Sequence, residues 1–138
     1  MVFSGAPSVL KKNIFCIFFL FLDYLLTYTF FVSEKVICNS SCALGIVCFI
    51  PNMWAMLFFP LSIVGFFFFR AKSVQEVFGW GLMFTGGISN VLDRMFFGCV
   101  YDIFSFFDLF YWNIADGYIF FGVIILFSSL FSRKNMLL

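Results

Sequence analysis

Histidine is absent from the 138 residues of this sequence, and charged residues make up only 11% of it. Without histidine, Ser-His and Cys-His catalysis and most zinc and haem sites are excluded. The net charge of +1 provides no basic field that would hold nucleic acid by counterion release, so we expect no nucleic-acid partner. We also expect no metal and no cofactor. Carboxylates, thiols, lysines and hydroxyls are the groups left for chemistry.

Apolar residues dominate instead, with a hydrophobic fraction of 64% and a mean hydropathy of +1.10. These values are typical of an integral membrane protein. The bilayer core needs roughly 20 mostly apolar residues per helix, and four segments qualify, at about 13–32, 43–69, 76–94 and 115–131. We therefore predict one all-α membrane domain over residues 1–138, with four transmembrane helices and short loops. Pro51 and Pro60 predict that the second helix is kinked or begins late.

The cations predict the orientation of these segments, because Lys and Arg accumulate on the cytoplasmic side of membranes. Four spans place six cations on one face: Lys11, Lys12, Arg70, Lys72, Arg133 and Lys134. Lys35 and Arg94 fall on the other face. Both termini are thus predicted to be cytoplasmic, and the loops 33–42 and 95–114 extracytoplasmic. The run from Ile14 to Val32 is too long for the core of a signal peptide, so we expect a retained first span.

The cysteines are odd in number: Cys16, Cys38, Cys42, Cys48 and Cys99. Helices embedded in lipid do not need disulfides for stability, so we interpret most of these cysteines as small apolar residues. A disulfide between Cys38 and Cys42 is the alternative, if their loop faces an oxidising compartment.

Carboxylates within or beside the apolar segments are costly to bury and need a partner or a task. Asp23 lies inside the first segment, without a neighbouring cation. An interfacial ion pair or a snorkelling helix end accounts for Asp93 and Arg94 at the end of the third segment. A charge that serves the helix dipole, worth about 0.3–1 kcal/mol, accounts for Asp116 at the start of the fourth.

Two functional interpretations compete with these structural ones. In the first, two aspartates lie close together and share a proton, so that one acts as a base and the other as an acid on an amide bond. In the second, Asp23 is the buried proton or cation site of a small transporter. Such sites usually lie near the bilayer midplane, whereas most carboxylates of this chain lie at its edge. Spacing alone does not decide between the two.

Many of the polar residues lie in three short motifs: "GGISNVLDR" (86–94), "GCVYDIF" (98–104) and "NIAD" (113–116). The segment "NSSCALGI" (39–46) and, before it, Asp23 precede them. In kind and order, these elements resemble the lipoprotein signal peptidase, or signal peptidase II, family, and the resemblance covers nearly the whole chain. It implies a monomeric aspartyl endopeptidase of a bacterial inner membrane, with its active site near the extracytoplasmic face.

The resemblance also implies a substrate and a set of site residues. The substrates are prolipoproteins, which are cut before the diacylglyceryl-modified cysteine, and membrane lipid is the other partner. The catalytic pair falls on Asp102 and Asp116. The positions that hold the substrate backbone fall on Asn39, Asn90, Arg94 and Asn113. Asp23 and Asp93 match structural or supporting positions.

Departures from the family pattern bear on substrate recruitment. The usual Gln and Lys after the first-span aspartate are missing from "DYLLTY" (23–28), and Ser41 and Leu44 replace a Gly and a Phe. The loop before Asn39 is shorter than in relatives, which implies at most a reduced β-cradle for the substrate. The aromatic segment "FSFFDLFYW" (104–112) is expected to cover the site. A catalytically inactive relative, or a four-helix proton-coupled transporter that uses Asp23, is the alternative.

Overall fold

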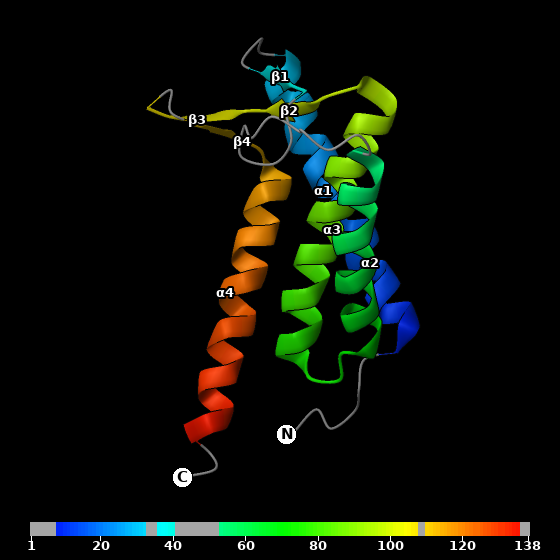
Figure 1. Ribbon diagram of the computed structural model, residues 1–138, viewed down its shortest axis with the longest axis vertical. Helices are drawn as coiled ribbons and strands as arrows, with labels where there is room; N and C mark the ends of the chain where they lie inside the picture. Colours follow the sequence, from blue (N-terminus) through cyan, green and yellow to red (C-terminus); the bar gives the residue numbers. More distant parts are fainter. Residues whose placement is uncertain (1–7, 33–35, 41–52, 108–109, 136–138) are drawn as a thin grey trace.

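The computed structural model describes residues 8–32, 36–40, 53–107 and 110–135. Helices run side by side, and short strands lie together at one end of them (Figure 1). The helices are α1 (Val9–Val32), α2 (Met53–Arg70), α3 (Val74–Phe97) and α4 (Ile114–Asn135). The prediction of a mainly helical protein is confirmed, and each predicted apolar segment overlaps one helix.

The observed helix ends differ from the predicted ones. At the start of α3, the Ser73 hydroxyl accepts a hydrogen bond from the Glu76 amide (3.1 Å), and the Glu76 carboxylate accepts one from the Ser73 amide (3.3 Å). This capping box begins α3 at Val74. Gly98, in the left-handed conformation with φ 76°, ends the helix at Phe97, beyond the predicted end at Arg94. Residues 43–52 of the second predicted span lie outside the described residues, whereas Pro60 lies within α2.

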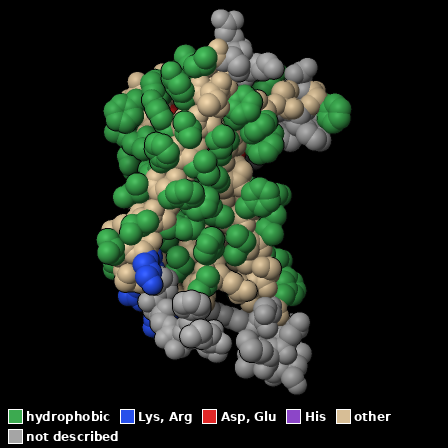
Figure 2. Space-filling view, turned by 180° about the vertical axis from the view of Figure 1, so that it is seen from behind, with side chains coloured by type: hydrophobic (Ala, Val, Ile, Leu, Met, Phe, Trp, Pro, Cys, Tyr) green, Lys and Arg blue, Asp and Glu red, His purple; other side chains and the backbone are tan. Residues whose placement is uncertain are grey.

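Among the described residues, two helices are long and apolar enough to cross a membrane: α1 and the Ile114–Phe131 part of α4. The apolar part of α2, Leu57–Arg70, is shorter. Apolar side chains cover much of the bundle surface, and Lys and Arg gather at the end away from the strands (Figure 2). A surface this apolar suits lipid rather than water around the helices.

α3 is the central helix and packs against α1, α2 and α4. Glycines allow α3 and α4 to approach closely: a Cβ atom at Gly86 would lie 2.4 Å from the Ala115 carbonyl oxygen, and one at Gly122 would lie 2.6 Å from the Gly79 carbonyl oxygen. Small residues favour helix association in lipid, where apolar burial provides no driving force between helices. The start of α4, at Ala115, is thereby held against the middle of α3, at Gly86.

Two small antiparallel sheets lie where the sequence predicted loops. β1 (Ile37–Asn39) pairs with β2 (Val100–Asp102), and β3 (Phe104–Phe106) pairs with β4 (Phe110–Trp112). Aromatic and β-branched residues favour strands, but runs of three residues are too short to show the alternation that predicts one. Within the predicted loop 95–114, the residues up to Phe97 belong to α3, and β2, β3 and β4 follow.

The interpretation of the cysteines as small apolar residues is wrong for Cys38 and Cys99, which are bonded to each other, and this bond also excludes the alternative disulfide between Cys38 and Cys42. In the β1–β2 register Cys38 lies opposite Tyr101, which brings it near Cys99, and the two Cα atoms are 5.5 Å apart. The separation of 61 residues concealed this pair in the sequence. Cys16 is free and buried, as expected for a small apolar residue. Cys42 and Cys48 lie outside the described residues.

Lys12, expected at the cytoplasmic side of the membrane, is buried, with 3% of its surface exposed. Its Nζ donates hydrogen bonds to the carbonyl oxygens of Phe68 (3.0 Å), Phe69 (2.8 Å) and Ala71 (2.8 Å). The last carbonyls of a helix lack partners within it, and a cation there also offsets the negative end of the helix dipole. Lys12 therefore ties α1 to the end of α2.

Lys12→Met is expected to lower the free energy of unfolding by about 2 kcal/mol, because buried carbonyl oxygens lose a charged donor. Methionine keeps most of the apolar stem, so the loss reports mainly on the hydrogen bonds. Thermal unfolding in detergent checks this prediction. Lys11→Met, at an exposed neighbouring position, is the matched control and should change stability by less than about 0.5 kcal/mol. Equal stability of the two variants would contradict the role of Lys12.

Candidate active site

Asp102 ends β2 and is almost completely buried, with 3% of its surface exposed. The chain reaches it after the left-handed turn at Gly98, which directs β2 across the end of the helical bundle (Figure 1). The Asn39 side chain, from β1, donates a hydrogen bond to Asp102 Oδ2 at 2.8 Å. The paired strands thus hold the Asp102 carboxyl group over the helix ends.

Asp116 lies in the first turn of α4, three residues after Asn113, which directly precedes the helix. Asn113 Oδ1 accepts a hydrogen bond from the Asp116 amide at 2.7 Å, and Asp116 Oδ2 accepts one from the Asn113 amide at 3.4 Å. This reciprocal arrangement is a capping box in which Asn and Asp replace the usual Ser and Glu. Capping therefore fixes the Asp116 carboxylate at the mouth of the helix.

Asn90, on α3, connects the two residues of this cap. Its Nδ2 donates to Asp116 Oδ1 at 3.0 Å, and its Oδ1 accepts from Asn113 Nδ2 at 2.8 Å. Arg94, one turn further along α3, donates from Nη1 to the Asn90 carbonyl oxygen at 3.0 Å. Asn113 is 4% exposed, and both ends of its side-chain amide are used within the protein. These contacts orient Asp116 from two helices.

One cavity of about 290 Å³ brings these side chains together. Its polar lining includes all six residues predicted for catalysis or substrate binding: Asn39, Asn90, Arg94, Asp102, Asn113 and Asp116. Apolar side chains from three helices complete the wall, among them Leu61, Val64, Met83 and Ile119. A mainly apolar cavity with a few convergent polar groups is the usual form of a ligand site. This one can accept an apolar peptide and present carboxylates to its backbone.

The electrostatics of the cavity favour a shared proton. Burial raises the pKa of Asp102 above its ordinary value of 3.8, and the nearby Asp116 carboxylate raises it as well. The hydrogen bond from Asn39 and the Arg94 guanidinium act in the opposite direction on this pKa. Because like charges in one cavity resist joint ionisation, the pair can supply an acid and a base together.

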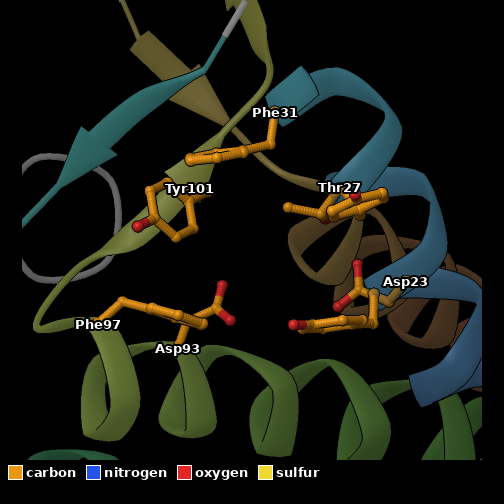
Figure 3. A pocket seen from close by; sticks show the side chains of 8 residues that line it. Asp23, Thr27, Phe31, Asp93, Phe97 and Tyr101 are labelled. Carbon is orange, nitrogen blue, oxygen red and sulfur yellow. The ribbon is translucent and has the colours of Figure 1, made fainter. Parts of the chain in front are cut away.

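Asp23 and Asp93 lie apart from this cavity. They line a second cavity, of about 220 Å³, between α1 and α3, and both carboxyl groups face into it (Figure 3). Phe31, Phe97 and Tyr101 form part of its aromatic wall (Figure 3). This placement separates the two aspartates from the other six predicted residues, and a supporting role for them stays a prediction.

Several participants were not singled out from the sequence. The Ser89 hydroxyl, which is buried, donates a hydrogen bond to Asp23, and Tyr111 lines the larger cavity. Ser89 lies within "GGISNVLDR", but nothing in that motif indicates a partner 66 residues away. Within the described parts of the chain, no group of three His, Cys, Asp or Glu side chains is arranged to hold a metal ion.

Comparisons with known proteins point to one family. A family model described as signal peptidase (SPase) II matches residues 8–132. The chain is 34% identical over 74 residues to a lipoprotein signal peptidase of Rickettsia conorii, and 32% identical over 71 residues to one of Rickettsia canadensis. Each match covers 49% of this chain and 36% of the relative, so most of each relative's length lies outside the match.

Two solved structures of bacterial membrane enzymes are similar in fold, with TM-scores of 0.76 and 0.75. The matches cover 94% of this chain and, respectively, 93% and 97% of the solved chains. The sequence identity is 21% in both cases, so this likeness concerns the fold alone. The helical bundle with strands at one end is therefore a fold that membrane enzymes use.

Proposed function

The chain belongs to the signal peptidase II family, and from this premise we propose that it is an aspartic endopeptidase of the membrane. Its proposed reaction removes the signal peptide from prolipoproteins by cleavage before the diacylglyceryl-modified cysteine. The observation that carries this proposal is the single cavity lined by both Asp102 and Asp116. The names of the two Rickettsia relatives support the substrate class.

In the proposed mechanism the pair holds one proton. Asp116, as the base, takes a proton from water while the water oxygen attacks the scissile carbonyl carbon. Asp102, as the acid, donates its proton to the carbonyl oxygen, so a neutral gem-diol forms. Asp116 then protonates the leaving nitrogen as the carbon–nitrogen bond breaks, and Asp102 recovers its proton from the diol.

The surroundings of the two carboxyl groups support this division of roles. Burial of Asp102 favours its neutral form, which is the form an acid needs. Asp116, in the first turn of α4, accepts hydrogen bonds from Asn90 Nδ2 and from the Asn113 amide, so its carboxylate is held in the same cavity as Asp102.

We further propose that the polar wall contacts the substrate backbone: Asn39, Asn90, Arg94 and Asn113. Their hydrogen bonds support a second role for the amides. Asn39 orients Asp102, whereas Asn90 and Asn113 orient Asp116. Arg94 lines the same cavity and places a positive charge near both carboxylates.

The proposed setting is a bacterial inner membrane, with residues 1–138 forming one monomeric domain of four spans surrounded by lipid. Both termini are proposed to be cytoplasmic, which the grouping of Lys and Arg at one end supports (Figure 2). The strands and the catalytic cavity then lie at the extracytoplasmic end. The Cys38–Cys99 disulfide supports this side, because disulfides persist in oxidising compartments. The two small sheets are proposed to act as a reduced substrate cradle.

The rate of cleavage is expected to fall on the alkaline side as Asp102 loses the proton that it donates. Because burial raises the pKa of Asp102 above 3.8, this fall occurs at higher pH than for an exposed aspartate. The Asn39 hydrogen bond favours the ionised form, so Asn39→Leu should raise this pKa further and move the alkaline limb to higher pH. The pH dependence of kcat checks the sign. If Asn39→Leu leaves the alkaline limb of the kcat profile at the same pH, that limb does not report the ionisation of Asp102.

The direct test of function is cleavage of a synthetic diacylglyceryl-modified prolipoprotein by the purified protein, with the products identified by mass spectrometry. We expect one cut, before the modified cysteine, and no cut in the matched peptide that lacks the diacylglyceryl group. A folded protein that cleaves neither peptide would contradict the proposal and favour an inactive relative. The transporter alternative has no support in the comparisons; it requires proton-coupled flux that Asp23→Asn abolishes.

A further inference from the structure

The Cys38–Cys99 disulfide joins the two strands that hold Asp102. Cys38 lies in the middle of β1, and Cys99 immediately precedes β2. In the ladder Cys38 pairs with Tyr101, and its neighbour Asn39 pairs with Val100. The disulfide is therefore attached to the chain neighbour of Asn39, whose side-chain amide contacts Asp102.

The hydrogen-bonded ladder between β1 and β2 is short. Each strand has three residues, and a two-stranded ribbon of this kind is marginally stable by itself. A shift of one residue would move the Asn39 side chain to the opposite face of the strand, away from Asp102 Oδ2. A covalent link at Cys38 prevents such a shift, because it fixes the position of the adjacent residue along β2.

We propose that the Cys38–Cys99 disulfide is a positioning device for the active site, which keeps β1 in register with β2 so that the Asn39 amide stays on Asp102. This inference rests on the proposed function of Asp102. The cysteines act through Asn39 and do not touch the reacting atoms. Opening the disulfide leaves the carboxyl group in place but removes the fixed donor to one of its oxygens.

The disulfide is asymmetric in its exposure. Cys38 is exposed, whereas Cys99 is 2% exposed. A dithiol reductant can therefore attack the Cys38 sulfur, form a mixed disulfide there and release the Cys99 thiolate, which takes up a proton. The second thiol of the reductant then displaces Cys38 as a thiol. Two electrons and two protons pass to the protein, and the dithiol becomes a cyclic disulfide.

The test uses the full chain with Cys16, Cys42 and Cys48 replaced by Ser, which leaves only the proposed pair. Reduction with dithiothreitol should lower kcat about tenfold, because the Asn39 amide no longer stabilises the carboxylate that forms when Asp102 donates its proton, with little change in KM. Reoxidation should restore the rate. The matched control carries Cys38→Ala and Cys99→Ala in addition; it should have the low rate at once and should not respond to the reductant.

A double-mutant cycle separates positioning from a general loss of structure. If the disulfide acts through Asn39, then reduction of Asn39→Leu should change kcat by less than about twofold, because the contact with Asp102 is already gone. A purely structural disulfide would produce the same tenfold loss in both backgrounds. That additive outcome, or an unchanged kcat in the reduced parent, overturns the proposal.

Amide hydrogen exchange provides a readout that does not depend on cleavage. Reduction should accelerate exchange at residues 37–39 and 100–102, while the amides of α3 and α4 remain protected. If the oxidised parent cleaves nothing, the proposed function fails, yet faster exchange in these strands still supports the positioning role. Unchanged exchange in a protein shown by thiol titration to be fully reduced overturns the inference in either case.

Discussion

Asp102→Asn and Asp116→Asn are each expected to lower kcat by about 10²–10⁴-fold. An amide has nearly the shape of a carboxyl group but neither gives nor accepts the proton that the reaction transfers. Asn at position 102 can still accept the hydrogen bond from Asn39, and the cavity keeps its shape. Single-turnover cleavage of the diacylglyceryl-modified substrate, followed for hours, measures the residual rate.

The matched control for this pair is Glu76→Gln, the same change of an acid to an amide at the other end of α3. Gln serves in a capping box as well as Glu does, so the cap on Ser73 is kept. This variant should cleave at the parental rate. Thermal unfolding should show that the two aspartate variants are folded. If Asp102→Asn cleaves as fast as the parent, Asp102 and Asp116 are not the catalytic pair.

The second large effect is expected at Asn113, because one side chain both caps α4 and orients Asp116. Asn113→Ala removes the acceptor for the Asp116 amide and the donor to Asn90. Loss of the cap should lower the free energy of unfolding by about 1 kcal/mol. Misplacement of the Asp116 carboxylate should lower kcat by about a hundredfold, since an error of 1 Å in a reacting group has this effect.

Asn113→Ser separates these two roles. Serine is a good N-cap residue, so the stability should return close to that of the parent. Its single short hydroxyl cannot also reach Asn90, so Asp116 remains poorly oriented and kcat should stay low. Denaturant unfolding and kcat are measured on the same preparations. If serine restores both quantities, capping alone explains Asn113, and the contact with Asn90 has no part in catalysis.

Much of the helical fold was predictable because it depends on local composition. The four apolar segments are long and nearly free of charge, and each overlaps a helix. Helix ends were less predictable. The hydropathy falls near Arg94, but α3 continues to Phe97, because the left-handed conformation that ends the helix is adopted by Gly98. The strands beside Asp102 escaped prediction because three residues carry too little pattern.

The candidate site divides in the same way. Carboxylates beside apolar runs were recognisable from the cost of placing them there, and the order of the motifs suggested which ones belong together. Their positions in space were not predictable from the sequence. The family resemblance set Asp23 and Asp93 apart as supporting residues, but only the packing of α1, which carries Asp23, against α3, which carries Asp93, shows that they line a separate cavity (Figure 3). Which side of a packed helix a residue faces depends on the helix that packs against it.

The sequence by itself determined which side chains are available for catalysis and that the chain suits a membrane. It has no histidine, it has acidic residues at the ends of apolar segments, and its composition is too apolar for a water-soluble protein. Only the tertiary structure decided the pairs: Cys38 with Cys99, Asn39 with Asp102, and Asn90 with Asp116. Local patterns reflect interactions between residues a few positions apart. These pairs are separated by 61, 63 and 26 residues, and they meet only because α3, packed against α4, and the turn at Gly98 bring them to one end of the bundle.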